Sequence, residues 1–157
     1  MIRKITTNDV PACTCVIQNA FATVADEFRL TPENCPTHAA FMTVEKLTRL
    51  HDKGVEMFAF WEKETPAGFI AIEASQKQAG TFFIEKLAVV PEHRHRGIGR
   101  HLMEFALERI AETGGRKASI GIINEHTVLK EWYRALGFRE TATKTFFHLP
   151  FTVCYLE

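Results

Sequence analysis

The sequence carries no net charge and no long apolar run. Its 157 residues include 19 basic and 19 acidic side chains, so no overall field would attract nucleic acid or an anionic membrane. No apolar stretch approaches the roughly 18 residues that a membrane span needs. Residues 1–21 lack the hydrophobic segment of a secretion signal. We therefore expect a soluble, cytoplasmic protein without nucleic-acid or membrane partners, whose anion sites are local.

Cysteine is also scarce. The four cysteines, Cys13, Cys15, Cys35 and Cys154, are too few for a disulfide framework in a chain of this length. A single residue separates Cys13 from Cys15, and no matching Cys/His pair accompanies them, which argues against a zinc site. We expect four reduced thiols, with Cys13 and Cys15 as small buried side chains, and no bound metal.

Repeats, low-complexity tracts and linkers are absent. Apolar residues make up 46% of the chain and charged residues 24%, as in an ordinary globular domain. A chain of this length buries about two-thirds of its unfolded surface around one core. We expect a single domain over residues 1–157.

Strand and helix signals alternate in the first third of the chain. A short strand is expected at Ile2–Ile5, followed by a helix at Val10–Ala25 that starts with Asp9 and Pro11. The spacing of apolar residues predicts a second helix over Ala39–Leu50.

Strands dominate the middle of the chain. Val55–Trp61 and Gly68–Glu73 flank a polar turn and predict a β-hairpin. The segment Phe82–Val90 is nearly continuous in apolar character and is stopped by Pro91, which predicts a central strand buried on both faces. Its one acid is Glu85.

The remaining elements complete a mixed α/β pattern. A helix ending at Gly114 leads into a strand at Ala118–Ile123, so this unit is β-α-β with a parallel or splayed strand pair. A short helix is expected at Thr127–Leu136, and two final strands at Lys144–His148 and Phe151–Leu156.

A basic turn with two glycines joins the strand ending at Val90 to the next helix. It reads Arg94-His95-Arg96-Gly97-Ile98-Gly99, and Arg100 follows. At a helix start the first N–H groups are unpaired and the helix dipole is positive, so phosphate binds well there. The turn matches neither the Walker phosphate loop nor the dinucleotide fingerprint. Its plain alternative is a solvated turn with no ligand.

The sequence around this turn favours the first interpretation, a turn that binds phosphate. The stretch Leu87-Ala88-Val89-Val90-Pro91-Glu92-His93-Arg94-His95-Arg96-Gly97-Ile98-Gly99 resembles the signature of the GNAT superfamily, Arg/Gln-x-x-Gly-x-Gly/Ala after a strand. The order of the later elements up to Gly137-Phe138 is also similar. The resemblance implies a central mixed, mostly antiparallel sheet with splayed parallel strands four and five, flanked by about four helices.

The resemblance also implies acetyl-CoA as the acyl donor. By analogy with the family, the turn would hold the pyrophosphate through main-chain N–H groups, and the pantetheine arm would pair with strand backbone. Asn124 matches the family asparagine after the fifth strand, but its interval to Tyr133 is two residues too long, so His126 is a second candidate. The implied contacts are Leu87, Ala88, Val89, Arg94, His95, Arg96, Gly97, Ile98, Gly99, Arg100, Asn124 and His126.

Two residues are candidates for proton transfer. Tyr133 matches the family tyrosine that precedes Gly-Phe, and its phenol would protonate the leaving thiolate; a core tyrosine is the alternative. Glu85 would deprotonate the substrate ammonium; an ion pair or a solvent-facing position is the alternative. His126 and His148 are other candidates for a proton relay.

The acceptor is expected to be a primary amine on a small molecule or a protein. The family resemblance places the acceptor pocket near residues 28–41 and 146–151, and the sequence does not rank the possible amines. An alternative function is an acyl-CoA-binding sensor or interaction module that performs no transfer. A homodimer through the final strands is compatible with the sequence.

Overall fold

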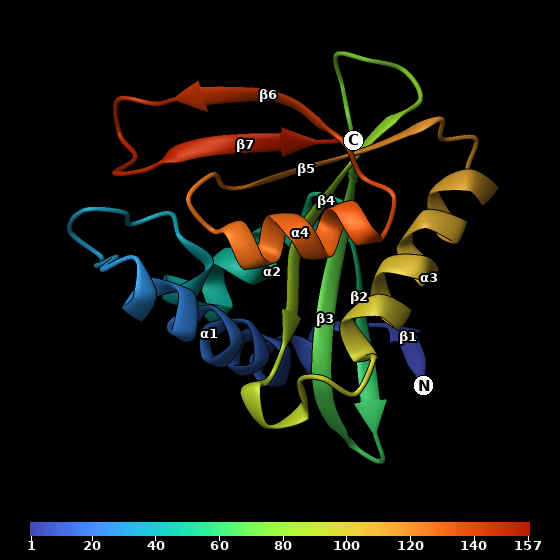
Figure 1. Cartoon of the computed structure of the whole chain (residues 1–157). Coiled ribbons are helices and arrows are strands. Elements are labelled where there is room, and N and C mark those ends of the chain that lie inside the picture. The colour runs from blue at the N-terminus through green and yellow to red at the C-terminus, as the bar shows by residue number, and fades with distance from the viewer.

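A seven-stranded sheet forms the centre of the computed structural model, which describes residues 1–157 (Figure 1). The strand order is β1-β2-β3-β4-β5-β7-β6, and only β4 and β5 run parallel. The predicted mixed, mostly antiparallel sheet is therefore confirmed. The strands are β1 (Ile2–Lys4), β2 (Glu56–Glu62), β3 (Thr65–Ala74), β4 (Thr81–Val89), β5 (Lys117–Ile123), β6 (Glu140–Thr145) and β7 (Thr152–Leu156).

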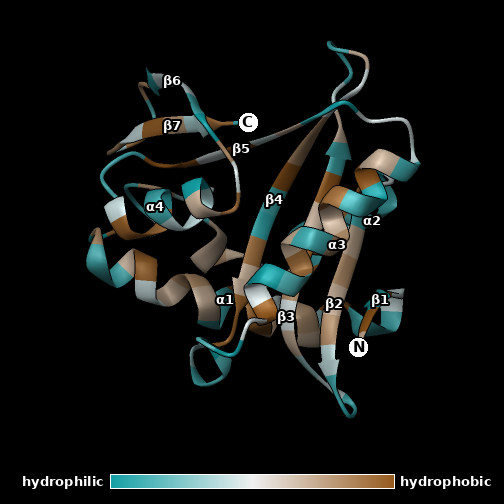
Figure 2. Cartoon of the chain, turned by 45° about the vertical axis from the view of Figure 1, so that its right-hand side comes forward, coloured by the Kyte–Doolittle hydropathy of each residue, from teal (hydrophilic) through white to brown (hydrophobic).

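Four α-helices cover the two faces of this sheet. Helices α1 (Val10–Glu27) and α2 (Val44–Asp52) share a hydrophobic cluster on one face, and α3 (Ile98–Glu112) and α4 (Thr127–Ala135) share another on the opposite face. Along α3, hydrophilic and hydrophobic residues alternate as in a helix with one buried side (Figure 2). No helix combines the length and the apolar character needed to cross a membrane.

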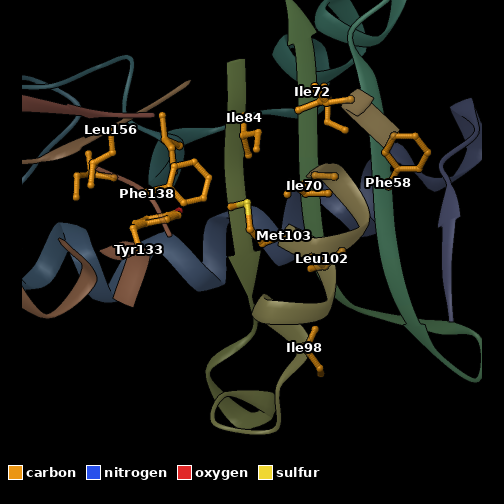
Figure 3. Close-up of a cluster of buried hydrophobic side chains, with 14 of the residues drawn as sticks. Phe58, Ile70, Ile72, Ile84, Ile98, Leu102, Met103, Tyr133, Phe138 and Leu156 are labelled. Atoms are coloured by element: carbon orange, nitrogen blue, oxygen red, sulfur yellow. The ribbon is translucent and has the colours of Figure 1, made fainter. Parts of the chain in front are cut away.

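The strand that is buried on both faces is β3. Ile70 packs toward Leu102 and Met103 of α3 (Figure 3), whereas its neighbour Phe69 packs with Ile17 of α1. Both Phe69 and Ile70 are fully buried, and they belong to different clusters because successive side chains of a strand point to opposite faces.

The prediction that β4 is buried on both faces was wrong. Strand β5 pairs with β4 only from Thr81 to Phe83 and then diverges from it (Figure 1). As a result Phe83 is 39% exposed, and most residues from Glu85 to Val89 are only half-buried. The apolar run in β4 therefore lines an open space between strands instead of a closed core.

The predicted second helix is two separate elements. A short 3₁₀ helix covers Ala39–Phe41, and α2 begins only at Val44. Thr43 breaks the continuity because it adopts an extended conformation and its side chain accepts a hydrogen bond from the N–H of Lys46. Threonine at this position starts a new helix.

The first of the two final strands also lies earlier than predicted. Strand β6 covers Glu140–Thr145 and not Lys144–His148, while β7 agrees with the prediction within a residue. All six residues of β6 are exposed, so the strand has no alternating apolar pattern that sequence could reveal. Residues 146–148 and Phe151, which were predicted to lie in the strands, belong to the connection between them.

The cysteines divide into three buried thiols and one exposed thiol. Cys13, Cys35 and Cys154 are buried, and all four cysteines are free. The prediction that Cys15 is buried was wrong, because it lies on the solvent side of α1, two residues from the inward-facing Cys13. Burial raises the pKa of the Cys13 thiol to about 12 and also raises the pKa values of Cys35 and Cys154.

This arrangement predicts that one thiol reacts rapidly with the disulfide reagent DTNB in the folded protein. Cys15 should react because it is accessible, while the other three are shielded and remain protonated. Cys15→Ser should remove the fast phase, and denaturant should expose the remaining thiols. A second fast-reacting thiol in the folded Cys15→Ser variant would contradict the described packing.

Candidate active site

A cavity of about 910 Å³ occupies the region where β4 and β5 separate. Its wall is formed by β4, β5, α1, the turn between β4 and α3, α4 and β7. Arginine and histidine side chains lie at the turn, whereas the carboxylates in the wall belong to Glu27 of α1 and to Glu85 of β4, which is paired with Lys86 of the same wall. The cavity thus connects an anion-attracting turn with a region that carries acid groups.

A bulge shapes the part of β4 that borders the cavity. Ala88 pairs with Phe69 of β3 and Glu85 pairs with Ala71, so Lys86 and Leu87 together face a single residue of β3. Lys86 has a φ of 54°, which is uncommon for a residue with a side chain. Beyond Phe83 the other edge of β4 has no partner strand, so backbone from Leu87 to Val89 is available to an extended ligand, apart from the Val89 carbonyl, which accepts a hydrogen bond from Arg94.

The turn between β4 and α3 has two backbone positions in the left-handed region. His95 has a φ of 61° and Gly97 a φ of 82°, and Gly97 is the N-cap of α3. Left-handed positions in a turn bring nearby N–H groups toward one side, where they form a concave anion site. A Cβ at Gly97 would meet nothing within 4 Å, so the backbone there faces open space. The turn therefore offers N–H groups and the positive end of α3 to an anion.

Arg94 ties this turn to two other elements. Its guanidinium donates hydrogen bonds to the Val89 carbonyl at 3.2 Å, to Thr23 Oγ1 at 3.1 Å and to the Ala20 carbonyl at 2.7 Å. Arg94 lines the cavity, but its N–H groups are directed at α1 and the end of β4. Its main effect in the structure is to fix the position of the turn.

Tyr133 lies on α4 and forms part of the cavity wall. Its side chain packs edge-on against Trp132, at 5.0 Å between ring centroids, and against Phe138, at 5.7 Å. Figure 3 shows Tyr133 beside Phe138. The residue is only 4% exposed, and this burial raises the pKa of the phenol. The hydroxyl therefore keeps its proton, as a proton donor must.

Glu85 faces the cavity from β4 and has charged neighbours. Lys86 Nζ lies 3.2 Å from its carboxylate, and the side chain is about one-third exposed, at 34%. Glu73 of β3 is close enough that the Glu85 charge helps to raise the pKa of Glu73, after the larger effect of burial. Glu85 thus forms an ion pair, which was the alternative to its role as a base. It also borders the cavity.

Asn124 and His126 lie in different surroundings. Asn124 Oδ1 accepts a hydrogen bond from Lys130 Nζ at 2.6 Å, and Asn124 is not part of the cavity wall. His126 lines the cavity, and its Nδ1 accepts the N–H of Leu129 at 3.4 Å as the N-cap of α4. The nitrogen that carries the hydrogen in neutral His126 is therefore Nε2, which makes it a donor.

The α1–α2 connection covers the cavity away from the basic turn. His38 lines the cavity between the rings of Phe21, at 5.7 Å, and Phe41, at 6.2 Å. Its Nδ1 accepts the N–H of Ala40 at 3.2 Å, and burial lowers its pKa. His38 is thus a neutral imidazole, and its Nε2 carries the hydrogen. His148 lies outside this wall, in the β6–β7 connection.

The cavity gathers most of the residues that the sequence proposed. Those in its wall are Glu85, Leu87, Ala88, Val89, Arg94, His95, Gly97, Ile98, Gly99, Arg100, His126 and Tyr133. Arg96 and Asn124 are not in the wall, because Glu62 and Lys130 respectively bind their side chains. Arg100, although in the wall, forms an ion pair with Glu104 one turn along α3.

Trp132 and Thr23 are among the residues of the site that were not anticipated from sequence. Trp132 packs on Gly99, since a Cβ there would lie 3.5 Å from the indole. Its position next to Tyr133 on a strongly amphipathic helix is the sequence feature that could have identified it. Thr23 binds Arg94 across 71 residues, and nothing in the sequence signals that contact.

Solved structures of acetyltransferases share this fold. The PaiA N-acetyltransferase of Thermoplasma acidophilum, solved in complex with coenzyme A, matches with a TM-score of 0.80 at 18% identity over 99% of this chain and 96% of that chain. The ribosomal-protein-S18-alanine N-acetyltransferase of Escherichia coli matches with a TM-score of 0.77 at 16% identity over 99% and 90% of the two chains.

A third structure with the same fold is YncA of Salmonella typhimurium, solved with its cofactor acetyl-CoA. It matches with a TM-score of 0.74 at 17% identity over 99% of this chain and 91% of that chain. At such identities these likenesses show the fold.

The family is shown by sequence. A sequence model of the acetyltransferase (GNAT) domain matches residues 28–150, an interval that holds β4, the basic turn, α3, β5 and Tyr133. The chain therefore belongs to the GNAT family of acetyltransferases.

Proposed function

We propose that this protein transfers the acetyl group of acetyl-CoA to a primary amine. The observation that carries the proposal is that one cavity joins the anion-binding turn, the unpaired edge of β4, Tyr133 and Glu85. An acyl transfer between a thioester and an amine needs each of these: a place for the phosphates, alignment of the acyl group, a proton donor and a proton acceptor.

The residues present fit acetyl-CoA. N–H groups from His95 to Gly99, at the positive end of α3, would bind the pyrophosphate. The edge of β4 from Leu87 to Val89 would pair with the pantetheine amides. His126, through Nε2–H, would donate to a pantetheine carbonyl in place of Asn124, whose oxygen Lys130 already binds.

When bound, acetyl-CoA supplies the acetyl group as an activated thioester. Glu85 takes one proton from the substrate ammonium, so that the neutral nitrogen attacks the acetyl carbon. A C–N bond forms as the C–S bond breaks, Tyr133 gives its proton to the sulfur, and the second nitrogen proton leaves to solvent. After Tyr133 regains a proton and Glu85 gives up the one it took, the reaction has released one proton overall. A backbone N–H near Val89 would bind the acyl oxygen and contribute roughly 3 kcal/mol to transition-state stabilisation.

The acceptor would enter between α1, the α1–α2 connection and β7. Glu27 favours a cation there, Glu85 carries a carboxylate that Lys86 already pairs with, and Phe21 and Phe151 provide apolar surface. The Escherichia coli protein of the same fold acts on an alanine of ribosomal protein S18. A primary amine on a peptide or on a small molecule satisfies the same requirements.

Gly97→Val should abolish the stabilisation that acetyl-CoA gives the unsubstituted protein, about 2.7 kcal/mol at 100 times its Kd. The valine strains a left-handed position and disturbs the N–H groups of the turn. Gly54→Val is the matched control, since Gly54 has a φ of 88° and equally open surroundings but lies outside the cavity wall. Thermal melts with and without ligand measure both. Equal ligand-induced shifts in the two variants would contradict the proposed pyrophosphate site.

Substitutions of the two proposed proton-transfer residues should lower activity with different pH dependences. Tyr133→Phe should lower kcat by about 10²- to 10⁴-fold at every accessible pH, because burial keeps the phenol protonated throughout. Glu85→Gln should cause a loss that shrinks as the pH rises toward the amine pKa of about 10, where the substrate is already neutral.

Release of free thiol from acetyl-CoA, followed over pH with an accepted amine, measures both effects. Amine-dependent release by the unsubstituted protein separates an enzyme from a module that only binds acyl-CoA. A Glu85→Gln loss that stays constant with pH would rule out the proposed base. Unchanged kcat in Tyr133→Phe would rule out the proposed acid.

A further inference from the structure

We propose that Glu62, at the end of β2, is a positioning residue that holds the phosphate-binding turn in its binding conformation. This inference rests on the proposed function, because it takes the turn between β4 and α3 as the pyrophosphate site. Glu62 is not in the cavity wall. Its effect on acetyl-CoA would therefore pass through the turn.

Glu62 binds two residues of the turn at once. One carboxylate oxygen lies 2.9 Å from a guanidinium nitrogen of Arg96, and the other lies 3.2 Å from Nδ1 of His93. Nδ1 of His93 also lies 2.5 Å from the other terminal nitrogen of Arg96. Because a ring nitrogen either donates or accepts, Nδ1 forms a hydrogen bond with Glu62 or with Arg96 in a given tautomer, and not with both. The three side chains form a closed triangle, which we call the Glu62 clamp.

The turn needs such restraint because its backbone is strained. His95 has a side chain and a φ of 61°, a conformation that costs free energy and persists only where the surroundings enforce it. The residues on either side of His95 are both anchored. Arg94 is bound to α1 and to β4, and Arg96 is bound to Glu62.

The other end of the Glu62 clamp is a rigid support. Glu62 pairs with Thr65 where β2 turns into β3, and its neighbour Trp61 is buried beneath the guanidinium of Arg3, 4.0 Å from the ring centroid. This hairpin and the turn lie at the same end of the sheet (Figure 1). The clamp therefore joins a fixed hairpin to a turn that would otherwise relax.

Simple electrostatics predicts the opposite effect for this carboxylate. A negative charge close to a phosphate site opposes anion binding, so its removal alone would tighten the binding of coenzyme A. Weaker binding after its removal would thus report the loss of positioning. The sign of the change separates the two interpretations.

Titration calorimetry with coenzyme A tests the clamp. Glu62→Gln should raise the Kd by roughly two- to fivefold, the effect expected from losing the partly exposed ion pair with Arg96 and the contact with His93, and kcat at saturating acetyl-CoA should be retained. Glu64→Gln is the matched control, because it removes the same charge from the same hairpin at an exposed residue with no ion pair. Its Kd should not change.

A double-mutant cycle assigns the role of Arg96. If Arg96 acts through Glu62, Glu62→Gln combined with Arg96→Gln should weaken coenzyme A binding no more than the larger single effect. If Arg96 instead binds phosphate directly, the two losses will add.

Additive losses, or a Glu62→Gln variant that binds coenzyme A as tightly as the unsubstituted protein or more tightly, would overturn the inference. Both outcomes require that the unsubstituted protein binds coenzyme A. Failure of the unsubstituted protein to bind would instead contradict the proposed function.

Discussion

The separation of β4 from β5 is the constraint on which the site depends. The two parallel strands pair over only three residues each, ending at Phe83 and Ser119. Beyond that point the backbone edge of β4 loses its partner, and a cavity takes the place of the missing hydrogen-bonded ladder. Unpaired edge backbone is costly when buried, so this stretch is suited to a ligand that completes the ladder. The same divergence places Tyr133 of α4 and Glu85 of β4 in one cavity wall.

The basic turn uses its charged residues in two ways. Of its arginines, Arg94 holds α1 and the end of β4, while Arg96 is bound by Glu62, so neither guanidinium is free at the cavity. What remains for an anion is the backbone at His95–Gly99, the dipole of α3 and Arg100, which lines the cavity although its Nε binds Glu104. The charges of Arg94 and Arg96 thus stabilise the shape of the turn, and its main-chain N–H groups are the part that we propose for anion recognition. This division accounts for a strained non-glycine residue, His95, beside Gly97.

Local sequence patterns predicted much of the fold. The features that they did not predict depend on contacts between residues that are distant in the sequence. The hairpin, β5, α3 and α4 were predictable because apolar periodicity and glycine or proline boundaries mark them. Strand β6 was misplaced because all its residues are exposed. The apolar run of β4 looked like core because a sequence cannot distinguish a buried face from one that lines a cavity. Within the site, the turn and Tyr133 follow from motif resemblance. The contacts of Arg96 with Glu62 and of Asn124 with Lys130 depend on tertiary packing.

Backbone amide chemical shifts during titration with acetyl-CoA test most directly whether the gap between β4 and β5 holds this ligand. We predict the largest changes in residues 87–89, 95–99 and 119–123, which border the cavity or, in the case of Arg96, belong to the same turn. Amides beside a second hollow of about 330 Å³, lined by Lys4, Phe58, Phe105 and Arg109 among others, should change little. Changes concentrated at that second hollow, with residues 95–99 unaffected, would contradict the account.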